Sequence, residues 1–356
     1  MKIELIGKLK TVMSNPHSHH GYFAWPTLAK LQDGRLALGA SGFRIEHVCP
    51  FGKSVISYSN DGGETYTFPA PVIDTPLDDR DAGICTFGDK GVIFTTFNNS
   101  AEVQREYNKD NDYVQRYIDT ITPEDEEKYL GALFRISNDC GITFGEIHHS
   151  PITSPHGPIQ LKNGTVIWAG TRFDDIFCGI EVRILDTESG ETELIGKITS
   201  SDKNVVLNEP HMVELPNGRL ICHIRGENAE LFHGGDETLF TVFQSVSDDG
   251  GRTWSEPEML LDKTGGAPPH LLLIKSGLLI SAYGRRKPPY GIMVMVSADG
   301  GKTWQTDIPV CDNLATDDLG YPSTVELDDG TLVTVFYAAE SESSPCNVYQ
   351  QKWRLK

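Results

Sequence analysis

The chain has 356 residues and a formal net charge of −19, with no basic stripe in its acidic background, which excludes a nucleic-acid partner. Apolar residues make up 38%, and 35 glycines and 20 prolines are typical of a turn-rich globular protein rather than a helical bundle or a disordered chain. No apolar run approaches the roughly 18 residues of a membrane span, so we expect no membrane partner.

Residues 3–9 alternate apolar and polar side chains and predict a strand at the N-terminus. This region lacks the apolar stretch of a secretory signal, so we expect a cytoplasmic protein, or a secreted one if a leader has been removed. The seven cysteines are odd in number, widely spaced and free of C-x-x-C pairs. They indicate buried free thiols rather than a disulfide framework or a metal cage, and we expect no cofactor.

Six segments share a pattern in which two apolar strands flank a turn that contains glycine. Asp-Gly and Asn-Gly recur in these turns, because both central residues of a primed hairpin turn need positive φ. The turn glycines are Gly34, Gly91, Gly164, Gly218, Gly277 and Gly330. The repetition indicates six similar β units.

A second pattern, S-x-D-x-G-x-T-aromatic, follows the second strand of four hairpins. It starts at Ser59, Ser137, Ser247 and Ser297. The aspartate of such a turn caps backbone N–H groups, and the aromatic ring packs at the sheet edge. We interpret these turns as structural connections with no catalytic role.

Units of about four strands, none able to bury both faces alone, predict an all-β fold, a single six-bladed β-propeller over residues 1–356. The N-terminal strand or the C-terminal residues 347–356 would complete the last blade and remove its exposed edge. A charged stretch in blade 2, residues 100–130, predicts a short helical insertion, with Thr122 as a cap and Pro123 in the first turn. The insertion is either a solvated decoration or a lid over the site.

Equal offsets from the turn glycines bring side chains to one opening of the central channel. Nine residues before the glycines lie Trp25, Ala82, Pro155, Glu209, Pro268 and Tyr321, and Asp81 lies one step earlier in blade 2. A short distance after the glycines lie Arg44, Arg172, Arg225 and Arg285. Clustered guanidinium groups indicate an anionic ligand such as a carboxylate, and a purely structural ion pair between Glu209 and Arg225 is the alternative.

Three histidines, His156, His211 and His270, lie seven or eight residues before their glycines, near the same opening. A three-histidine metal site needs convergent geometry, so we predict hydrogen bonds to substrate hydroxyls and no bound metal. Trp25 offers a flat face on which a sugar ring could stack.

The six hairpins, the four S-x-D-x-G-x-T turns, "NEPHMVELPNGRL" with "HIR", "GRR" and "GYPSTVELDDGTL" resemble the sialidase (exo-neuraminidase) superfamily over nearly the whole chain. The resemblance implies a tyrosine nucleophile activated by a glutamate, with arginines that hold the substrate carboxylate. By motif, these roles fall on Tyr321, Glu209, Arg225 and Arg285. A neutral phenol suits a sugar whose anomeric carbon bears a carboxylate, because a carboxylate nucleophile would be repelled.

Two features depart from the superfamily pattern. The R-I-P arginine of the first strand is replaced by "AWP" at residues 24–26, and the acid/base aspartate expected after the first hairpin is missing. Candidates for a third carboxylate contact are Arg44, Arg80 and Arg172. Candidates for the acid/base are Asp81, which we favour, and Glu46 and His47.

We therefore expect a sialidase-like exo-glycosidase that releases a terminal acidic sugar, sialic acid or a related nonulosonic acid, with retention. Two alternatives remain, a hydrolase or lyase for another acidic glycan and a propeller that binds glycans without turnover. The fold alone does not decide between them, and the pattern does not indicate an oligomeric state.

Overall fold

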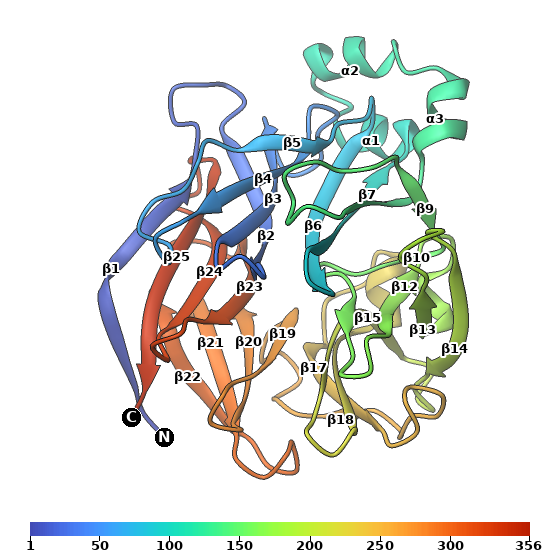
Figure 1. The fold of residues 1–356 in the computed structure, drawn as a ribbon. Helices are drawn as coiled ribbons and strands as arrows, with labels where there is room; N and C mark the ends of the chain where they lie inside the picture. Colours follow the sequence, from blue (N-terminus) through green and yellow to red (C-terminus); the bar gives the residue numbers. More distant parts are fainter.

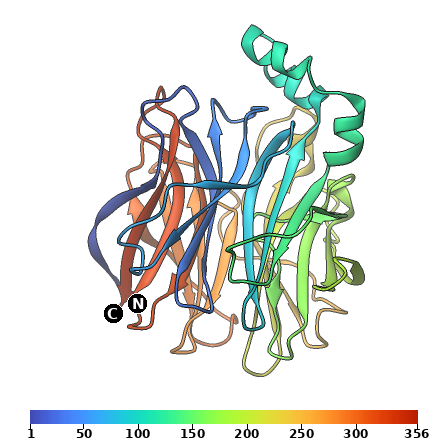
Figure 2. The same ribbon diagram turned by 45° about the horizontal axis from the view of Figure 1, so that its top comes forward.

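The computed structural model describes residues 1–356 as a closed ring of six antiparallel sheets, which confirms the predicted six-bladed β-propeller (Figure 1, Figure 2). The N-terminal strand β1 (Ile3–Met13) pairs with β25 (Cys346–Leu355), so both ends of the chain contribute to blade 6. The two termini lie side by side in Figure 1. Closure of the ring therefore joins the first and last strands in one sheet.

In blades 1 to 5 the strands follow in chain order from the central channel outward, and in blade 6 the N-terminal strand β1 lies outside β25. Blade 1 has β2 (Tyr22–Lys30), β3 (Leu36–Arg44), β4 (Lys53–Ser59) and β5 (Ala70–Ile73). Blade 2 has β6 (Asp78–Phe87), β7 (Gly91–Asn99), β8 (Ala132–Ser137) and β9 (His148–Ser150). Blade 3 has a broken inner strand, β10 (Ile152–Thr153) and β11 (Ile159–Gln160), then β12 (Val166–Arg172), β13 (Ile180–Leu185) and β14 (Thr192–Ile198).

The other three blades have unbroken inner strands. Blade 4 has β15 (Val205–Glu214), β16 (Leu220–Asn228), β17 (Phe240–Ser247) and β18 (Glu258–Met259). Blade 5 has β19 (Pro269–Leu273), β20 (Leu279–Arg285), β21 (Gly291–Ser297) and β22 (Gln305–Asp312). Blade 6 has β23 (Leu319–Glu326), β24 (Leu332–Ala339), β25 and β1.

The hydrophobic core consists of layers between neighbouring blades. The layer between blades 5 and 6, for example, includes the fully buried Ile292, Phe336 and Trp353. Each blade therefore buries both faces only when its two neighbours are in place, which is the physical reason for closure.

The four S-x-D-x-G-x-T turns share one set of hydrogen bonds on the outer part of the propeller. In the first turn, Asp61 accepts from the backbone N–H and the hydroxyl of Thr65, at 2.8 and 2.6 Å. These bonds lower the pKa of Asp61 well below its usual range. Asp139, Asp249 and Asp299 repeat the arrangement. The aspartates are thus occupied by their own turns, as a structural role requires.

The blade 2 insertion forms three short helices, α1 (Ala101–Tyr107), α2 (Asp112–Ile118) and α3 (Pro123–Tyr129), above one side of the ring (Figure 2). Thr122 and Asp125 form a capping box with Pro123 in the first turn, as predicted. Val114 and Ile118 are fully buried, and Phe51 packs against the rings of α2. The insertion is therefore fixed to the propeller. None of the helices has the length and apolar character needed to cross a membrane.

Candidate active site

Four inner strands carry a non-glycine residue with positive φ at the same opening of the channel. The φ values are 52° at Trp25, 51° at Asp81, 47° at Glu209 and 48° at Tyr321. Each lies in a break of the strand register, so these positions are β-bulges that turn a side chain out of the sheet. Such backbone strain costs about 1–3 kcal/mol per residue and is typical of functional sites.

Tyr321 and Glu209 meet across the channel from blades 6 and 4. The Tyr321 hydroxyl donates to Glu209 Oε1 at 2.5 Å, and Arg225 Nη1 donates to Glu209 Oε2 at 2.8 Å. Arg225 Nη1 also lies 3.4 Å from the Tyr321 oxygen. The predicted association of these three side chains is therefore present in the structure.

The environment keeps the Tyr321 phenol protonated. Burial raises its pKa well above the ordinary value, and the charge of Glu209 adds to that effect, while Arg225 opposes it. A phenol with a raised pKa is a poor nucleophile unless a base removes its proton during attack. Glu209 is placed to be that base, because its carboxylate already accepts the phenol hydrogen.

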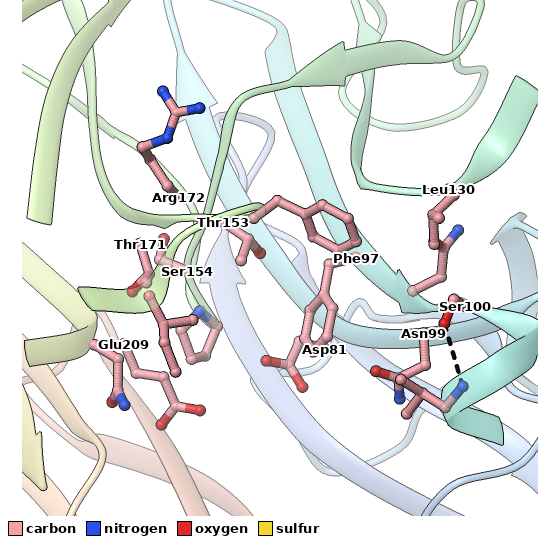
Figure 3. Close-up of a pocket in the computed structure, with 16 residues that line it drawn as sticks. Asp81, Phe97, Asn99, Ser100, Leu130, Thr153, Ser154, Thr171, Arg172 and Glu209 are labelled. Carbon is pink, nitrogen blue, oxygen red and sulfur yellow. Dashed lines mark hydrogen bonds between the residues drawn. The ribbon is translucent and has the colours of Figure 1, made fainter. Parts of the chain in front are cut away.

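Asp81 is the second acidic group of the opening. Its side chain is buried, and burial, followed by repulsion from Glu209, raises the pKa of Asp81 to about 7. Figure 3 shows the carboxyl groups of Asp81 and Glu209 turned toward the same part of a pocket. A carboxyl group that is half-protonated near neutral pH can act as a general acid and then as a base.

A pocket of about 490 Å³ extends from these two carboxyl groups. Its other walls come from blades 2 and 3 and from the insertion, where Ser100, Val103 and Leu130 line it. The insertion thus forms part of the pocket wall, and its role as a lid stays a prediction.

Arg80 of blade 2 packs against Trp25 near the opening. Its guanidinium group lies 4.0 Å from the centre of the Trp25 ring and donates to the His47 carbonyl oxygen at 2.5 Å. Burial acts to lower the pKa of Arg80, but the charges of Asp78, 3.6 Å away, and then of Asp81 raise it above the ordinary value. Of the predicted set, Arg44, Arg80 and Arg172, Arg80 is therefore the member that lies over the ring of Trp25, one of the four bulged residues of the opening.

The predicted site residue Arg285 is one position away, along the chain, from the arginine that lies beside Tyr321. Arg285 Nε donates to the carbonyl oxygen of Pro289 at 2.6 Å, on an exposed loop. The next residue, Arg286, lies over the Tyr321 ring at 5.7 Å and donates to Leu319 O and to the Tyr337 hydroxyl, at 2.9 and 3.2 Å. Consecutive side chains point to opposite sides of an extended chain, so a one-residue error exchanges the two arginines.

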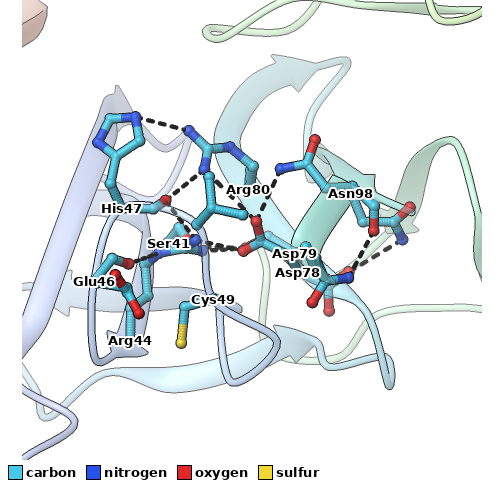
Figure 4. Close-up of polar contacts among 12 residues, drawn as sticks. Ser41, Arg44, Glu46, His47, Cys49, Asp78, Asp79, Arg80 and Asn98 are labelled. Carbon is cyan, nitrogen blue, oxygen red and sulfur yellow. Dashed lines mark hydrogen bonds and ion pairs between the residues drawn. The ribbon is translucent and has the colours of Figure 1, made fainter. Parts of the chain in front are cut away.

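Arg44, predicted to contact substrate, is instead a structural residue in the wall behind Arg80 (Figure 4). It is completely buried, pairs with Asp78, and donates to the Ser41 hydroxyl and to the carbonyl oxygens of residues 46, 47 and 79. A guanidinium group with all its donors engaged and no exposed surface has none left for a ligand. Its interactions hold the loop whose carbonyl oxygen at His47 receives Arg80.

Trp25 is also placed differently from the sugar platform that was predicted. It is 1% exposed, and Arg80 covers its ring at 4.0 Å while Arg44 lies at 4.9 Å. Its face is thus occupied by guanidinium groups, and it supports Arg80 by a cation–π contact.

Three other predicted candidates have partners of their own. Arg172 lines the pocket but is bound by Asp174, with Nε to Oδ1 at 2.7 Å, so its charge is offset. His47 contacts the Tyr22 hydroxyl at 3.1 Å, and Asn111 donates to Glu46 at 3.5 Å. Glu46 and His47 line a separate pocket with Asp318. Of the acid/base candidates, only Asp81 shares a pocket with Glu209.

His156, His211 and His270, predicted to bond to substrate hydroxyls, lie away from the pocket of Asp81 and Glu209, and His211 and His270 line a second pocket of about 600 Å³. All three are buried, with ring centres 4.4–5.5 Å apart, and their Nδ1 atoms bond to Thr27 Oγ1, Leu271 N and Thr324 N. Burial lowers their pKa values, so they are neutral. An offset of seven residues rather than nine moves a side chain about 7 Å down an extended strand. The histidines therefore lie within the channel, below the opening.

Two polar residues of the site were not found from the sequence. Buried Glu227 accepts from Arg225 Nη2 at 2.5 Å and from Asn208 Nδ2 at 2.6 Å, and Asn208 lines the pocket beside Glu209. Glu227 thus orients both neighbours. The available signal was its position two residues after Arg225, because alternate residues of a strand share a face.

The family model described as BNR repeat-like domain matches residues 125–334 of this chain. No curated protein matches this chain. Three solved structures illustrate the similarity of the fold.

A protein of unknown function from Dyadobacter fermentans has a TM-score of 0.79 and 19% identity, with 99% of each chain covered. The Hadza microbial sialidase Hz136 has a TM-score of 0.66 and 14% identity, covering 96% of this chain and 68% of that one. The Penicillium chrysogenum alpha-L-arabinanase complexed with arabinobiose has a TM-score of 0.60 and 15% identity, with 97% of each chain covered.

Proposed function

The chain belongs to the BNR repeat-like domain family, and on that premise we propose that it is a sialidase-like glycoside hydrolase. The substrate is a glycan with a terminal acidic sugar, sialic acid or a related nonulosonic acid, which the enzyme releases with retention. The observation that carries the proposal is the 2.5 Å hydrogen bond from the Tyr321 hydroxyl to Glu209, with Arg225 bonded to the glutamate and Arg286 over the tyrosine ring.

In the first step, Tyr321 attacks the anomeric carbon while Glu209 takes the phenol proton. The bond from that carbon to the leaving oxygen breaks, and Asp81 gives its proton to this oxygen. The products are a tyrosyl glycoside and the free leaving alcohol. Glu209 is now protonated and Asp81 is ionised, so the charge within the site is unchanged.

In the second step, water attacks the same carbon and gives a proton to Asp81. The bond to Tyr321 breaks, and Glu209 returns its proton to the phenol oxygen. Both side chains are then in their starting states. Two inversions at one carbon give net retention.

Three arginines support the acidic character of the substrate. Arg225 and Arg286 lie beside Tyr321, and Arg80 lies over the neighbouring Trp25 ring. Glu209 and Glu227 are the carboxylates paired with Arg225. The two hydrogen bonds of Arg286 go to uncharged oxygens. Arg286 therefore has no carboxylate partner of its own and is the guanidinium group that a substrate carboxylate would bind, whereas the charge of Arg80 is shared with Asp78.

A second candidate is a glycosidase for a neutral sugar that uses the carboxyl groups of Asp81 and Glu209 as its catalytic pair. The pocket favours it, because Asp81 and Glu209 line this pocket while Tyr321 does not. The similar fold of the alpha-L-arabinanase adds weight to this candidate. In this reaction Tyr321 would only orient Glu209.

The test compares wild type with Tyr321→Phe on a fluorogenic sialoside and on a fluorogenic alpha-L-arabinofuranoside. We expect turnover of the sialoside and a loss on the order of 10³-fold in kcat for Tyr321→Phe, together with a tyrosyl adduct in the intact-protein mass spectrum of the quenched wild type. Turnover of the arabinofuranoside alone, unaffected by Tyr321→Phe, would establish the second candidate instead. No turnover of either substrate would contradict both.

A further inference from the structure

The pocket beside Asp81 lies on one side of the reacting groups. It is lined by Asp81 and Glu209 but not by Tyr321, Arg80, Arg225 or Arg286. In a displacement at the anomeric carbon, the nucleophile and the leaving oxygen lie on opposite sides of that carbon. A pocket that includes the general acid and excludes the nucleophile and its arginines is therefore on the side of the leaving group.

Away from Asp81 and Glu209, the polar groups that line this pocket carry no unpaired charge. Thr171 is 6% exposed, and its hydroxyl has no hydrogen-bond partner. Asn208 Oδ1 is also buried without a partner. Arg172, the one cation in the lining, is paired with Asp174. Unpaired buried polar groups are costly, and hydroxyl groups of a neutral ligand would satisfy them.

An apolar wall faces these polar groups. Val103 of α1 is 50% exposed although it lines the pocket, and Leu130 at the other end of the insertion lines it too. Figure 3 shows Leu130 on the insertion side and Thr171 on the blade 3 side. A sugar ring has both a C–H surface and a rim of hydroxyl groups, so it fits a pocket with one apolar and one polar wall.

We infer that this pocket is a leaving-group subsite that binds the neutral sugar next to the cleaved bond, with the 100–130 insertion as its outer wall. The inference rests on the proposed glycosidase reaction. It makes the protein selective for an acidic sugar attached to a glycan, rather than to any alcohol.

The test uses two substrates with the same sialic acid. Sialyllactose fills the pocket with a hexose, whereas sialyl fluoride has a leaving group too small to reach it. Val103→Trp blocks the pocket from an exposed helix surface, and Thr171→Val removes the unpaired hydroxyl at constant shape. Glu102→Trp adds the same ring one position away on α1 and serves as the control.

We expect Val103→Trp and Thr171→Val to lower kcat/KM for sialyllactose about tenfold or more, and to leave sialyl fluoride within about twofold of wild type. Glu102→Trp should change neither. Equal losses on both substrates would place the acidic sugar itself in this pocket and overturn the inference. Unchanged kinetics of both variants on sialyllactose would also overturn it.

Binding of lactose separates this inference from the proposed function. If wild type turns over neither sialoside, the proposed function fails, and calorimetric titration with lactose then tests the pocket alone. Saturable binding that Val103→Trp abolishes and Glu102→Trp retains would support the neutral-sugar site. An absence of lactose binding to wild type would overturn it.

Discussion

The opening of the channel and its interior are built by the same inner strands, yet they differ in charge and backbone geometry. At the opening, Asp81, Glu209 and Tyr321 have positive φ and ionisable groups in close contact. Two residues further down the strands, His211 and His270 stack as neutral rings bound to backbone N–H groups. The difference teaches that the bulge, rather than the strand, creates reactive positions, since the regular backbone below it holds the rings of His211 and His270 by hydrogen bonds from backbone N–H groups.

The largest effect is expected from Asp81→Asn, which changes a reactive residue at the opening. Asp81 must be protonated to act as the general acid, and its pKa of about 7 means that kcat/KM should fall as pH rises through that value. Asp81→Asn should lower the rate on sialyllactose by about 10²–10⁴-fold and remove this alkaline decline. Rates measured from pH 5 to 9 give the profile.

An aryl sialoside provides the control for this prediction, because a phenolate needs little protonation to leave. Its rate should fall much less in Asp81→Asn than that of sialyllactose. Equal losses on the two substrates, or an unchanged alkaline decline in the variant, would remove Asp81 from the role of acid.

A smaller effect is expected at Arg285 and Arg286. Their side chains point to opposite sides of the chain, so only one of the two variants should affect the site. Arg286→Ala should lower kcat/KM for a sialoside about 10²-fold, because a charge-assisted contact to the carboxylate contributes about 1.5–3 kcal/mol. Arg285→Ala, whose side chain bonds only to the Pro289 carbonyl oxygen, should retain wild-type kinetics. A greater loss in Arg285→Ala would contradict the assignment.

The spacing of the six turn glycines was enough to predict the propeller and to bring Tyr321, Glu209 and Arg225 together. These positions are fixed by the repeat, so a constant offset identifies them. The same offset misses Asp81 by one position, because the bulge of blade 2 lies one residue earlier relative to Gly91. Asp81 is adjacent to Ala82, the residue that the constant offset identifies.

Other features could not be predicted because they depend on depth or on partners from distant loops. Arg44 shares the arginine pattern, but Asp78 and three carbonyl oxygens occupy it within the wall. His211 and His270 lie about two residues further down the inner strands than the side chains at the opening. Glu227 and Arg286 have no role until the three-dimensional positions of Arg225 and Tyr321 are known.

The smallest expected effect is on stability, and it concerns the interior of the channel. Burial lowers the pKa of His211 to about 4, below the ordinary value of about 6.5. The unfolded chain therefore binds a proton between these pH values that the folded chain does not, so His211 reduces stability as pH falls through this window. Between pH 6.5 and 5 this amounts to about 2 kcal/mol of unfolding free energy.

His211→Asn tests this linkage, because the asparagine Oδ1 can still accept from Leu271 N and cannot become protonated. Urea unfolding at pH 5.0, 5.75 and 6.5 should show a smaller loss of stability toward acid than in wild type, while sialoside kinetics at neutral pH stay the same. Asp81 acts in the opposite direction, since its raised pKa adds stability as pH falls through 7, so only the difference between variant and wild type isolates His211. Parallel stability curves would mean that the channel histidines accept protons as freely as they do in the unfolded chain, and that the interior is hydrated like the opening.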